Sequence, residues 1–298
     1  MSARRRAVVG VDIGGTNVKI GVFSERTIRS PRSVATGVDD GLEHILRRVS
    51  DEVSAVIHES EAEGTRVGGV GVGVPGLVDR EAGRVLHAAN LGWSDVPLST
   101  LLSRELRLPV WVDNDVYLGA LAEARLGAAS GAQAALFVAI GTGVAASCVG
   151  AVGTWRGANG FAGELGFTRT PDLVEDAVSA RGLTTEYERW TGRSKRPDEI
   201  AGSLDEDHIS RLVWARFCDD LGLAVWNAVA LLDPSHVVLG GGLAEAGSRL
   251  VEPVAAALAV AAPDFRPIPQ VMVAEFGWLA GCVGAGVMAT EKLAVHRP

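Results

Sequence analysis

The first apolar stretch of the chain is broken by a glycine turn and then resumes with the alternation of a strand. Residues 8–13 are rich in β-branched residues, and the next four residues read Gly-Gly-Thr-Asn. Val18, Ile20 and Val22 continue with period two, which predicts a strand, whereas a Rossmann fingerprint or a P-loop would open a helix there. The N–H groups of such a hairpin can bind phosphate with help from the Thr16 hydroxyl, although an ordinary buried hairpin also fits the pattern.

The same pattern returns in the second half of the chain. Residues 134–140 are mostly apolar, Gly141-Thr142-Gly143 follows, and residues 144–149 are mostly apolar again. Two units of strand, turn and strand in separate halves indicate a duplicated fold whose turns face a shared cleft. One ligand with several phosphates would suit that cleft.

Polar side chains gather where a short predicted strand ends and a helix begins. Residues 110–112 are apolar and β-forming, Asp113-Asn114-Asp115 follow directly, and residues 116–126 have the Ala and Leu content of a helix. An N-cap explains one of the three polar residues. Because α/β enzymes bind ligands at such strand ends, a catalytic carboxylate is the second interpretation.

The remaining stretches predict helices between glycine-rich strand ends. Apolar positions over residues 42–57 recur at helical spacing, and residues 67–74 predict a glycine-laced strand that ends in a Pro-Gly turn. Residues 160–167 form a glycine-rich loop, in which Glu164 is the single carboxylate. A polar segment then carries short helices near residues 173–180 and 185–190.

Near the C-terminus, a long helix over residues 209–232 precedes a third glycine-rich strand end. Residues 237–239 predict a strand, and Gly240-Gly241-Gly242 lead into a helix that reaches about residue 262. Three glycines there would let a flat ligand lie against the backbone. A strand at residues 272–273 and a helix over residues 277–293 complete the prediction.

Composition narrows the class of protein. With 298 residues and 47% apolar content, the chain can bury one or two cores, and its length favours two domains. Its net charge of −8 argues against nucleic acid as a partner. Cys148, Cys218 and Cys282 stand singly in apolar runs, as expected of buried thiols in a reducing cytosol. The nearest approach to a membrane span, residues 253–262, is too short. We therefore expect a soluble, cytoplasmic protein.

Taken together, the motifs resemble the ROK family (repressor, open reading frame, kinase) of the actin-like sugar kinase superfamily. The resemblance covers essentially the whole chain, and the matching stretches follow the family order: residues 12–19, 73–79, 90–93, 114–115, 140–143, 163–166 and 240–242. It implies an α/β protein with the two-domain actin-like (ribonuclease H-like) ATPase fold and duplicated glycine-turn β-hairpins. The implied small domain is residues 1–115 plus a helix of about residues 280–298, and residues 116–279 form the large domain, with ATP and sugar in the cleft between.

The resemblance also implies a role for each motif. Phosphoryl transfer needs in-line positioning, charge neutralisation and a carboxylate near the nucleophile, and Asp115 would be the base that takes the proton from the primary hydroxyl. Asp113 matches the family pattern less well. Asp12 would hold Mg²⁺ through water. The other implied nucleotide contacts are Gly14, Gly15, Thr16, Asn17, Lys19, Thr142, Gly143, Gly241 and Gly242, and the implied sugar contacts are Gly76, Asn90, Asn114, Asp115 and Glu164.

The chain departs from the family after its Gly-Glu-Leu-Gly loop. Most members place a His there, followed by a Cys-x-Cys-Gly-x-x-Gly-Cys-x-Glu segment, and these residues bind a structural zinc. Here Phe167 takes the His position, and residues 168–187 contain neither cysteine nor histidine. A tetrahedral thiolate site cannot be built from them, so we predict no zinc and expect apolar packing to hold the segment. The expected contributors are Leu173, Val174, Val178 and Leu183.

The same departure affects sugar recognition. The family His and final Glu usually touch the sugar near C1 and C2, where Phe167 cannot form a hydrogen bond. Glu186 takes the final Glu position if the spacing from the His is kept, and Thr185 takes it if Tyr187 anchors the match. We assign Glu186, which could also be a helix acid favoured by the dipole. We expect an ATP-dependent kinase acting on the 6-hydroxyl of glucose or a glucose-like hexose, including amino-substituted sugars such as kanosamine.

Other functions fit parts of the pattern. A family repressor would carry a helix-turn-helix domain, but only seven residues precede the first predicted strand. A non-catalytic sugar- and nucleotide-binding regulator would explain the missing zinc segment but not Asp115 and both glycine turns. An actin-like ATPase or acyl kinase would leave Asn90, Asn114 and Glu164 unexplained. The family also implies a homodimer, with Trp155, Trp190 and Trp214 either in its interface or in the core.

Overall fold

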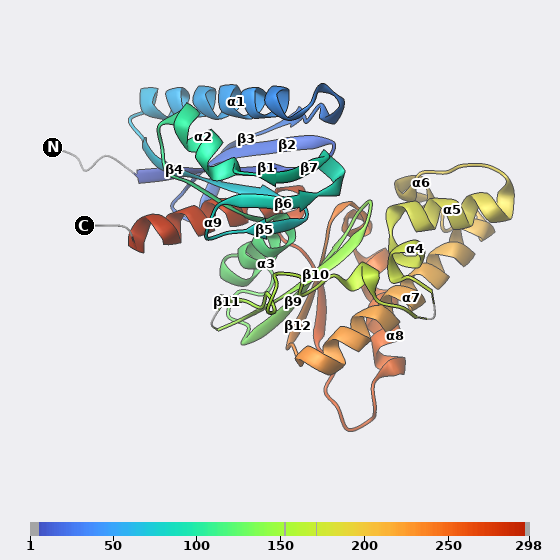
Figure 1. Ribbon diagram of the computed structural model, residues 1–298. Helices are drawn as coiled ribbons and strands as arrows, with labels where there is room; N and C mark the ends of the chain where they lie inside the picture. Colours follow the sequence, from blue (N-terminus) through green and yellow to red (C-terminus); the bar gives the residue numbers. More distant parts are fainter. Residues whose placement is uncertain (1–5, 152, 171, 296–298) are drawn as a thin grey trace. The chain divides into compact units, whose positions relative to one another are not determined.

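The computed structural model describes residues 6–151, 153–170 and 172–295 (Figure 1). It divides the chain into two compact units, Met1–Ala122 with Leu279–Pro298 and Glu123–Trp278. The chain therefore passes between the units twice, after residue 122 and after residue 278. The predicted small domain includes residues 1–5 and 296–298, which lie outside the described residues.

The first unit is built on a five-stranded sheet that contains the first glycine hairpin. Its strands, in sheet order, are β3 (Thr27–Ala35), β2 (Asn17–Ser24), β1 (Arg6–Ile13), β4 (Arg66–Val74) and β8 (Val110–Asn114). β1 and β2 are antiparallel around the glycine turn, which confirms the predicted strand, turn and strand. Because β1, β4 and β8 are parallel, with Asp12 beside Gly73 and Val74 beside Asn114, their carboxyl ends meet at one edge.

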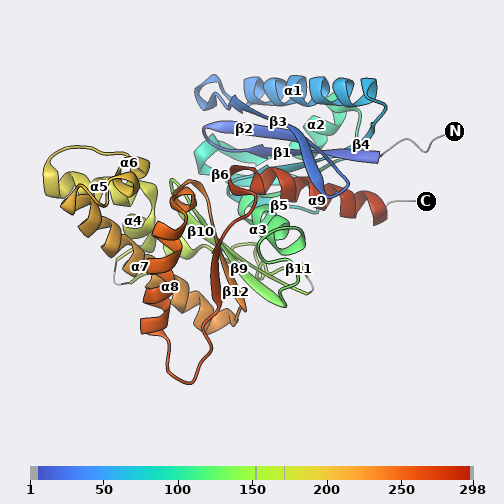
Figure 2. The ribbon, with the colours of Figure 1, turned by 180° about the vertical axis from the view of Figure 1, so that it is seen from behind.

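Helices cover both faces of this sheet. α1 (Leu42–Ala62) and α2 (Leu98–Leu106) lie on one side, and α9 (Ala280–Val295) lies on the other (Figures 1 and 2). Gly10 and Gly71 face α9, because a Cβ on either residue would overlap a backbone carbonyl oxygen of that helix. The valines between the glycines point to the α1 side and form the core there. The glycine-laced strand therefore reflects close packing of a helix.

The helical segment Gly277–Val295 is long and apolar enough to cross a membrane by length and composition, and half of it is buried inside the structure. It meets that test better than residues 253–262, which the sequence analysis took as the nearest approach. Ala285 and Met288 of this segment pack against Leu118 in the first unit. The apolar side chains of this helix therefore pack within the first unit.

A small antiparallel sheet that the sequence did not predict belongs to the same unit. It consists of β5 (Leu77–Asp79), β6 (Arg84–Ala88) and β7 (Trp93–Val96). Gly76 precedes β5, and Asn90 lies in the 3₁₀ turn between β6 and β7. Next along the chain after β8 comes α3 (Asp115–Arg125), as predicted.

The second unit repeats the arrangement of the first. Its sheet, in order, is β11 (Gly153–Thr154), β10 (Val144–Gly150), β9 (Ala134–Ile140), β12 (His236–Gly240) and β13 (Gln270–Val273). β9 and β10 form an antiparallel hairpin around the second glycine turn, and β12 runs parallel to β9, as β4 does to β1. The duplicated glycine-turn hairpins are therefore present.

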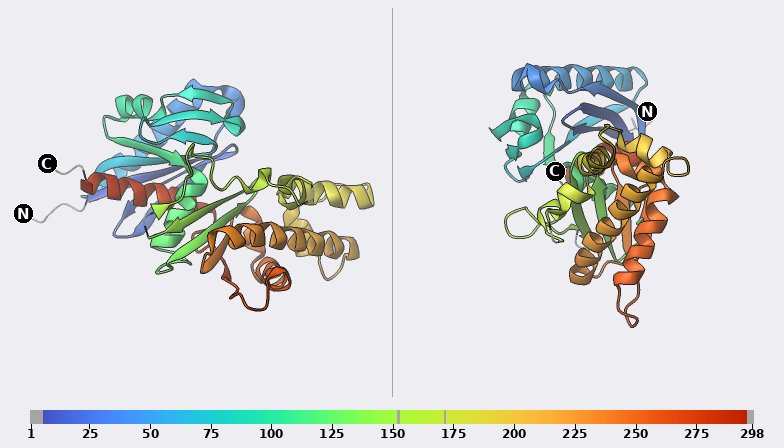
Figure 3. Two further views of the ribbon diagram at one scale, coloured as in Figure 1. Left: turned by 60° about the horizontal axis from the view of Figure 1, so that its bottom comes forward. Right: turned by 90° about the vertical axis from the view of Figure 1, so that its right-hand side faces the viewer.

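Two long helices pack against this second sheet. α7 (His208–Leu232) and α8 (Ser248–Ala261) lie side by side (Figure 3). The prediction of one helix from residue 243 to about 262 is wrong at its start. Gly242–Ala246 is a 3₁₀ turn, and Gly247, with φ 61° and ψ −127°, breaks the chain direction before α8.

The segment without zinc ligands folds as α4 (Val174–Val178), α5 (Ala180–Thr191) and α6 (Pro197–Gly202). Val174, Val178 and Leu183 are buried in the core of the second unit, as predicted, whereas Leu173 is only half-buried. The second predicted helix, residues 185–190, begins five residues earlier in the structure. Its first turn is stabilised because the Ser179 hydroxyl accepts the N–H of Gly182 at 3.1 Å.

A polar bridge adds to that apolar packing. Asp207 caps α7 by accepting the N–H groups of Ile209 and Ser210, and its other oxygen accepts hydrogen bonds from Lys195 at 3.0 Å and Tyr187 at 2.8 Å. These two donors hold the pKa of Asp207 below its usual range. The bridge joins α5 and the chain before α6 to α7.

The predicted buried thiols and tryptophans divide into two groups. Cys218 and Cys282 are buried, but Cys148 is half-buried, which corrects the prediction for that residue. Trp214 lies in the core, with its ring 5.5 Å from that of Phe217. Trp155 and Trp190 are exposed on the second unit.

One buried carboxylate holds the chain where it enters the second unit. Glu123 is 1% exposed, and it accepts backbone N–H groups of Ala128 at 2.9 Å, Glu275 at 3.1 Å and Phe276 at 2.9 Å. It thereby joins the end of α3 to the segment that leads out of the unit. A carboxylate with three such donors is well satisfied despite its burial.

Replacing Glu123 by alanine should loosen both segments. Three part-buried N–H groups would lose their acceptor, so Glu123→Ala should lower the free energy of unfolding of the second unit by on the order of 3 kcal/mol. Hydrogen exchange at the Glu275 and Phe276 amides should accelerate about 10-fold or more. The exposed Glu188→Ala serves as the control, and equal exchange in both variants would contradict the assignment.

Candidate active site

In the first unit, two carboxylates approach each other across a glycine. Asp12 is the penultimate residue of β1, Asp115 opens α3, and Gly73 of β4 lies between them. A Cβ on Gly73 would stand 3.6 Å from the Asp12 carboxylate and 3.5 Å from the Asp115 Cα. The glycine leaves open the space in which the two acids lie close together.

A lysine on the neighbouring strand partly neutralises this pair. Asp12 is 6% exposed, and Lys19 lies directly opposite it in the β1–β2 register, with 3.0 Å between Nζ and Oδ2. On the α9 side, Gly281 packs against the same carboxylate, because a Cβ there would stand 2.8 Å from the Asp12 Cγ. Asp12 is therefore enclosed by a cation and by backbone.

Asp115 has the perturbed acidity expected of a functional carboxyl group. Burial, followed by the negative charge of Asp12, raises the pKa of Asp115 to about 7. The N–H of Val116, which donates to Asp115 Oδ1 at 2.9 Å, and the Lys19 ammonium act in the opposite direction. The charge of Asp115 therefore changes near neutral pH. Residues with strongly shifted pKa values are concentrated at functional sites.

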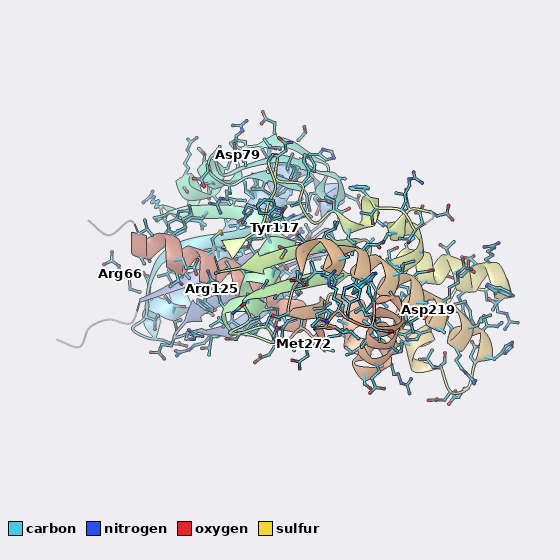
Figure 4. The ribbon with its side chains drawn as sticks, turned by 90° about the horizontal axis from the view of Figure 1, so that it is seen from below. Arg66, Asp79, Tyr117, Arg125, Asp219 and Met272 are labelled. Carbon is cyan, nitrogen blue, oxygen red and sulfur yellow. The ribbon has the colours of Figure 1, made fainter. Side chains whose placement is uncertain are left out.

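The two residues that precede Asp115 have structural partners. Asn114 Oδ1 accepts the N–H of Tyr117 at 3.0 Å, which is the predicted helix cap, and Tyr117 itself is almost fully buried (Figure 4). Asn114 Nδ2 donates to the Gly76 carbonyl at 2.9 Å. Asp113 is 3% exposed and accepts the N–H of Asn114, so it is the less accessible acid of the two.

The Asn114 hydrogen bond brings two of the predicted sugar contacts together. Gly76 has φ +86°, and a Cβ there would overlap the carbonyl oxygen of His87 in β6. Only glycine fits this approach without strain. The small sheet thus positions Gly76 next to Asn114.

The first glycine turn is braced by Thr36, a residue that no sequence motif marks. Thr36 is buried, its hydroxyl donates to the Gly14 carbonyl at 2.6 Å, and its N–H donates to the Thr16 carbonyl at 2.9 Å. Gly15, Thr16 and Asn17 are exposed at the tip. A Cβ on Gly15 would lie 3.3 Å from the carbonyl oxygen of Asn90, so this predicted sugar contact lies beside the turn.

In the second unit, the second glycine turn is held by the start of α5. Gly141 donates to the Gly143 carbonyl at 2.9 Å and accepts the N–H of Ala180 at 2.8 Å. Thr142 is exposed at the tip. Gly241, with φ +83°, packs on the backbone of Ile140, so this part of the triple-glycine segment lies beside the residue that precedes the turn. Gly242 is exposed.

The Gly-Glu-Leu-Gly loop lies on the same hairpin. Gly163 has φ +96°, its carbonyl accepts the N–H of Ala146 at 2.7 Å, and a Cβ on it would overlap the Ala146 carbonyl. Glu164 is half-buried, and burial together with the negative charge of Glu175 raises its pKa. Within the described residues, no ion pair or hydrogen bond involves the Glu164 carboxylate. Phe167 is 70% exposed.

Glu186 has its hydrogen-bond and ion-pair partners outside that loop. Its carboxylate accepts the indole N–H of Trp190 at 2.9 Å and lies 3.4 Å from guanidinium nitrogens of Arg189 and Arg216. These donors would compete with a sugar hydroxyl. Thr185, the alternative residue, is exposed, and the assignment between the two stays a prediction.

Comparison with known proteins identifies the family. The model of the ROK family matches residues 8–292, which is nearly the whole chain. This chain belongs to the ROK family. The α/β actin-like ATPase fold predicted for a ROK member is confirmed by a solved ROK glucokinase from Streptomyces griseus, in complex with glucose and AMPPNP. That structure is 27% identical, with a TM-score of 0.84 over 96% of this chain and 99% of its own.

Two curated ROK relatives have different roles. A glucokinase from Halalkalibacterium halodurans is 29% identical over 96% of both chains. A xylose repressor from Caldicellulosiruptor bescii is 26% identical over 83% of this chain and 68% of its own. Family membership therefore covers both kinases and repressors, and the residues of the site have to distinguish them.

The Lys19 ammonium should control the acidity of Asp115. In Lys19→Met, loss of the positive charge should raise the pKa of Asp115 further above about 7, while Lys19→Arg should leave it close to the parent value. Carboxyl ¹³C NMR titration of the free protein measures this directly. An Asp115 titration that is the same in Lys19→Met and in the parent would contradict the electrostatic link.

Proposed function

We propose that this ROK protein is an ATP-dependent kinase that phosphorylates the 6-hydroxyl of glucose or a glucose-like hexose. The observation that supports the proposal most is Asp115, a half-buried carboxylate with a pKa near neutrality beside the Asn114 and Gly76 pair. The glucokinase relatives, including the one solved with glucose and AMPPNP, support the same class of reaction. A regulator without turnover would have no use for a base at this position.

In the proposed reaction, the ionised Asp115 accepts the proton of the 6-hydroxyl. The sugar oxygen forms its bond to the γ-phosphorus, and the bond from that phosphorus to the bridging oxygen of ADP breaks. Asn114, held by Gly76 and by the cap of α3, would orient the sugar next to the base. The exposed tips of the two glycine turns would bind phosphate oxygens through backbone N–H groups and the hydroxyls of Thr16 and Thr142.

Mg²⁺ fits the donor set of the first unit. It is a hard cation that proteins usually hold through one or two carboxylates together with substrate phosphates. Asp12 supplies such a carboxylate, and Asp115 lies close to it across Gly73. Bound through water to Asp12, Mg²⁺ would neutralise charge on the transferred phosphoryl group. Lys19 already offsets part of the Asp12 charge in the free protein.

The substrate range is the part of the proposal that depends on the altered loop. Phe167 presents an exposed ring where most members have a His, so recognition near C1 and C2 would differ from the family pattern. Amino-substituted hexoses such as kanosamine therefore belong among the candidate substrates. We further propose a cytoplasmic homodimer, with exposed Trp155 and Trp190 as candidate interface residues.

The first test is ADP release with Mg-ATP against glucose, mannose, fructose, allose, glucosamine, kanosamine and N-acetylglucosamine. Turnover is expected on at least one sugar, and Asp115→Asn should reduce kcat by about 10²- to 10⁴-fold, the usual contribution of a general base. The parent kcat/KM should rise with pH through about 7 as Asp115 loses its proton. Hexose binding in calorimetry without any turnover would support the regulatory alternative instead.

A second test concerns Phe167. Phe167→His should restore a hydrogen-bonding group at the loop and change the ratio of kcat/KM between sugars that differ at C1 or C2 by about 10-fold. Phe161→His, on a neighbouring exposed aromatic residue, is the matched control. If Phe167→His left the ranking of sugars unchanged, the link between this loop and specificity would be wrong.

A further inference from the structure

Two glycines from different motifs of the second unit share one neighbour. A Cβ on Gly143, in the second glycine turn, would stand 2.5 Å from Glu175 Oε2. A Cβ on Gly166, at the end of the Gly-Glu-Leu-Gly loop, would stand 3.0 Å from the same oxygen. The Glu175 carboxylate therefore lies against the backbone at both positions, and at Gly166 the Val144 carbonyl oxygen, 2.8 Å from such a Cβ, is closer still.

Glu175 is also bonded to the backbone that follows the turn. Its Oε2 accepts the N–H of Val144 at 3.4 Å, and the residue is half-buried on α4. Around it, the Val144 carbonyl would lie 2.8 Å from a Cβ on Gly166. The turn, the loop and the Glu175 side chain are therefore packed as one layer within this unit.

The same carboxylate changes the acidity of Glu164, the residue of the loop that is predicted to bind the sugar. The negative charge of Glu175 adds to burial in raising the pKa of Glu164. Within the described residues, neither acid has a cation in an ion pair. Two neighbouring acids without a compensating cation repel each other, so the Glu175 carboxylate lies against the turn and the loop at an electrostatic cost.

We propose that Glu175 is a positioning residue that couples the Gly141–Val144 turn to the Gly163–Gly166 loop. The inference rests on the proposed function, in which the turn binds nucleotide phosphate and Glu164 binds the sugar. Through Glu175, a ligand that orders one of these segments lowers the free energy needed to order the other. Nucleotide and sugar therefore each raise the affinity for the other by the same factor. No sequence motif marks the residue, because it lies in the segment where the family pattern is lost.

The experiment compares Glu175→Ala and Glu175→Gln with Asp176→Ala, a matched control on the same short helix whose carboxylate lies at the surface beside Arg181. Calorimetry measures the affinity for AMPPNP with Mg²⁺, with and without the best sugar. We expect the parent to bind nucleotide about 5-fold or more tightly with sugar present, the range of common coupling energies. Glu175→Ala should abolish that ratio, whereas Glu175→Gln, which can still accept the Val144 N–H, should retain most of it.

Hydrogen exchange of the free protein gives a readout that needs no ligand. Glu175→Ala should accelerate exchange in residues 141–144 and 163–166 together by about 10-fold, with α7 unchanged. Unchanged exchange, or a coupling ratio equal to that of the parent, would overturn the role of Glu175. A parent that binds neither nucleotide nor sugar would overturn the proposed function and, with it, the coupling, whereas the exchange result would still assign the packing role.

Discussion

The approach of Asp12 and Asp115 across Gly73 is the constraint on which the first unit depends. Two acids can be this close only if something offsets their repulsion, and Lys19 on the adjacent strand supplies the charge. The local sequence follows this requirement: β1 carries an acid at its penultimate position, β2 places a lysine opposite it, and β4 carries glycine between the two acids. The parallel order of β1, β4 and β8 then brings Asn114 and Gly76 to the same edge.

In the second unit, glycines also pack against a carboxylate, but no cation lies beside it within the described residues. Gly143 and Gly166 leave room for this carboxylate, and among the described residues the donor to Glu175 is the weak Val144 N–H. Repulsion between Glu164 and Glu175 is therefore less relieved than repulsion between Asp12 and Asp115. In the first unit the pKa of Asp115 is raised to about 7, while in the second unit Glu175 lies against both the turn and the loop.

Much of this architecture could be predicted from the sequence, because glycine turns and strand periodicity are local signals. The two hairpins, α1, α3 and the acids at the end of β8 were predicted for this reason, and the family resemblance gave the fold. The small sheet β5-β6-β7 was missed, since its strands are three to five residues long and carry little periodicity. Thr36 and Glu175 were missed because each acts on a motif that is distant in the chain, and only tertiary packing brings them there.

After Gly166, where the chain departs from the family pattern, several interactions hold the segment that a zinc site holds in other members. In members with a zinc site, according to the family pattern, the same His serves both the metal and the sugar. Here the segment is held by Val174, Val178 and Leu183 in the core and by the Asp207 bridge. Within the described residues, no group of three metal-ligating side chains comes together. Neither the core nor the bridge involves Phe167, whose ring is 70% exposed, so the packing of this segment places no demand on that side chain.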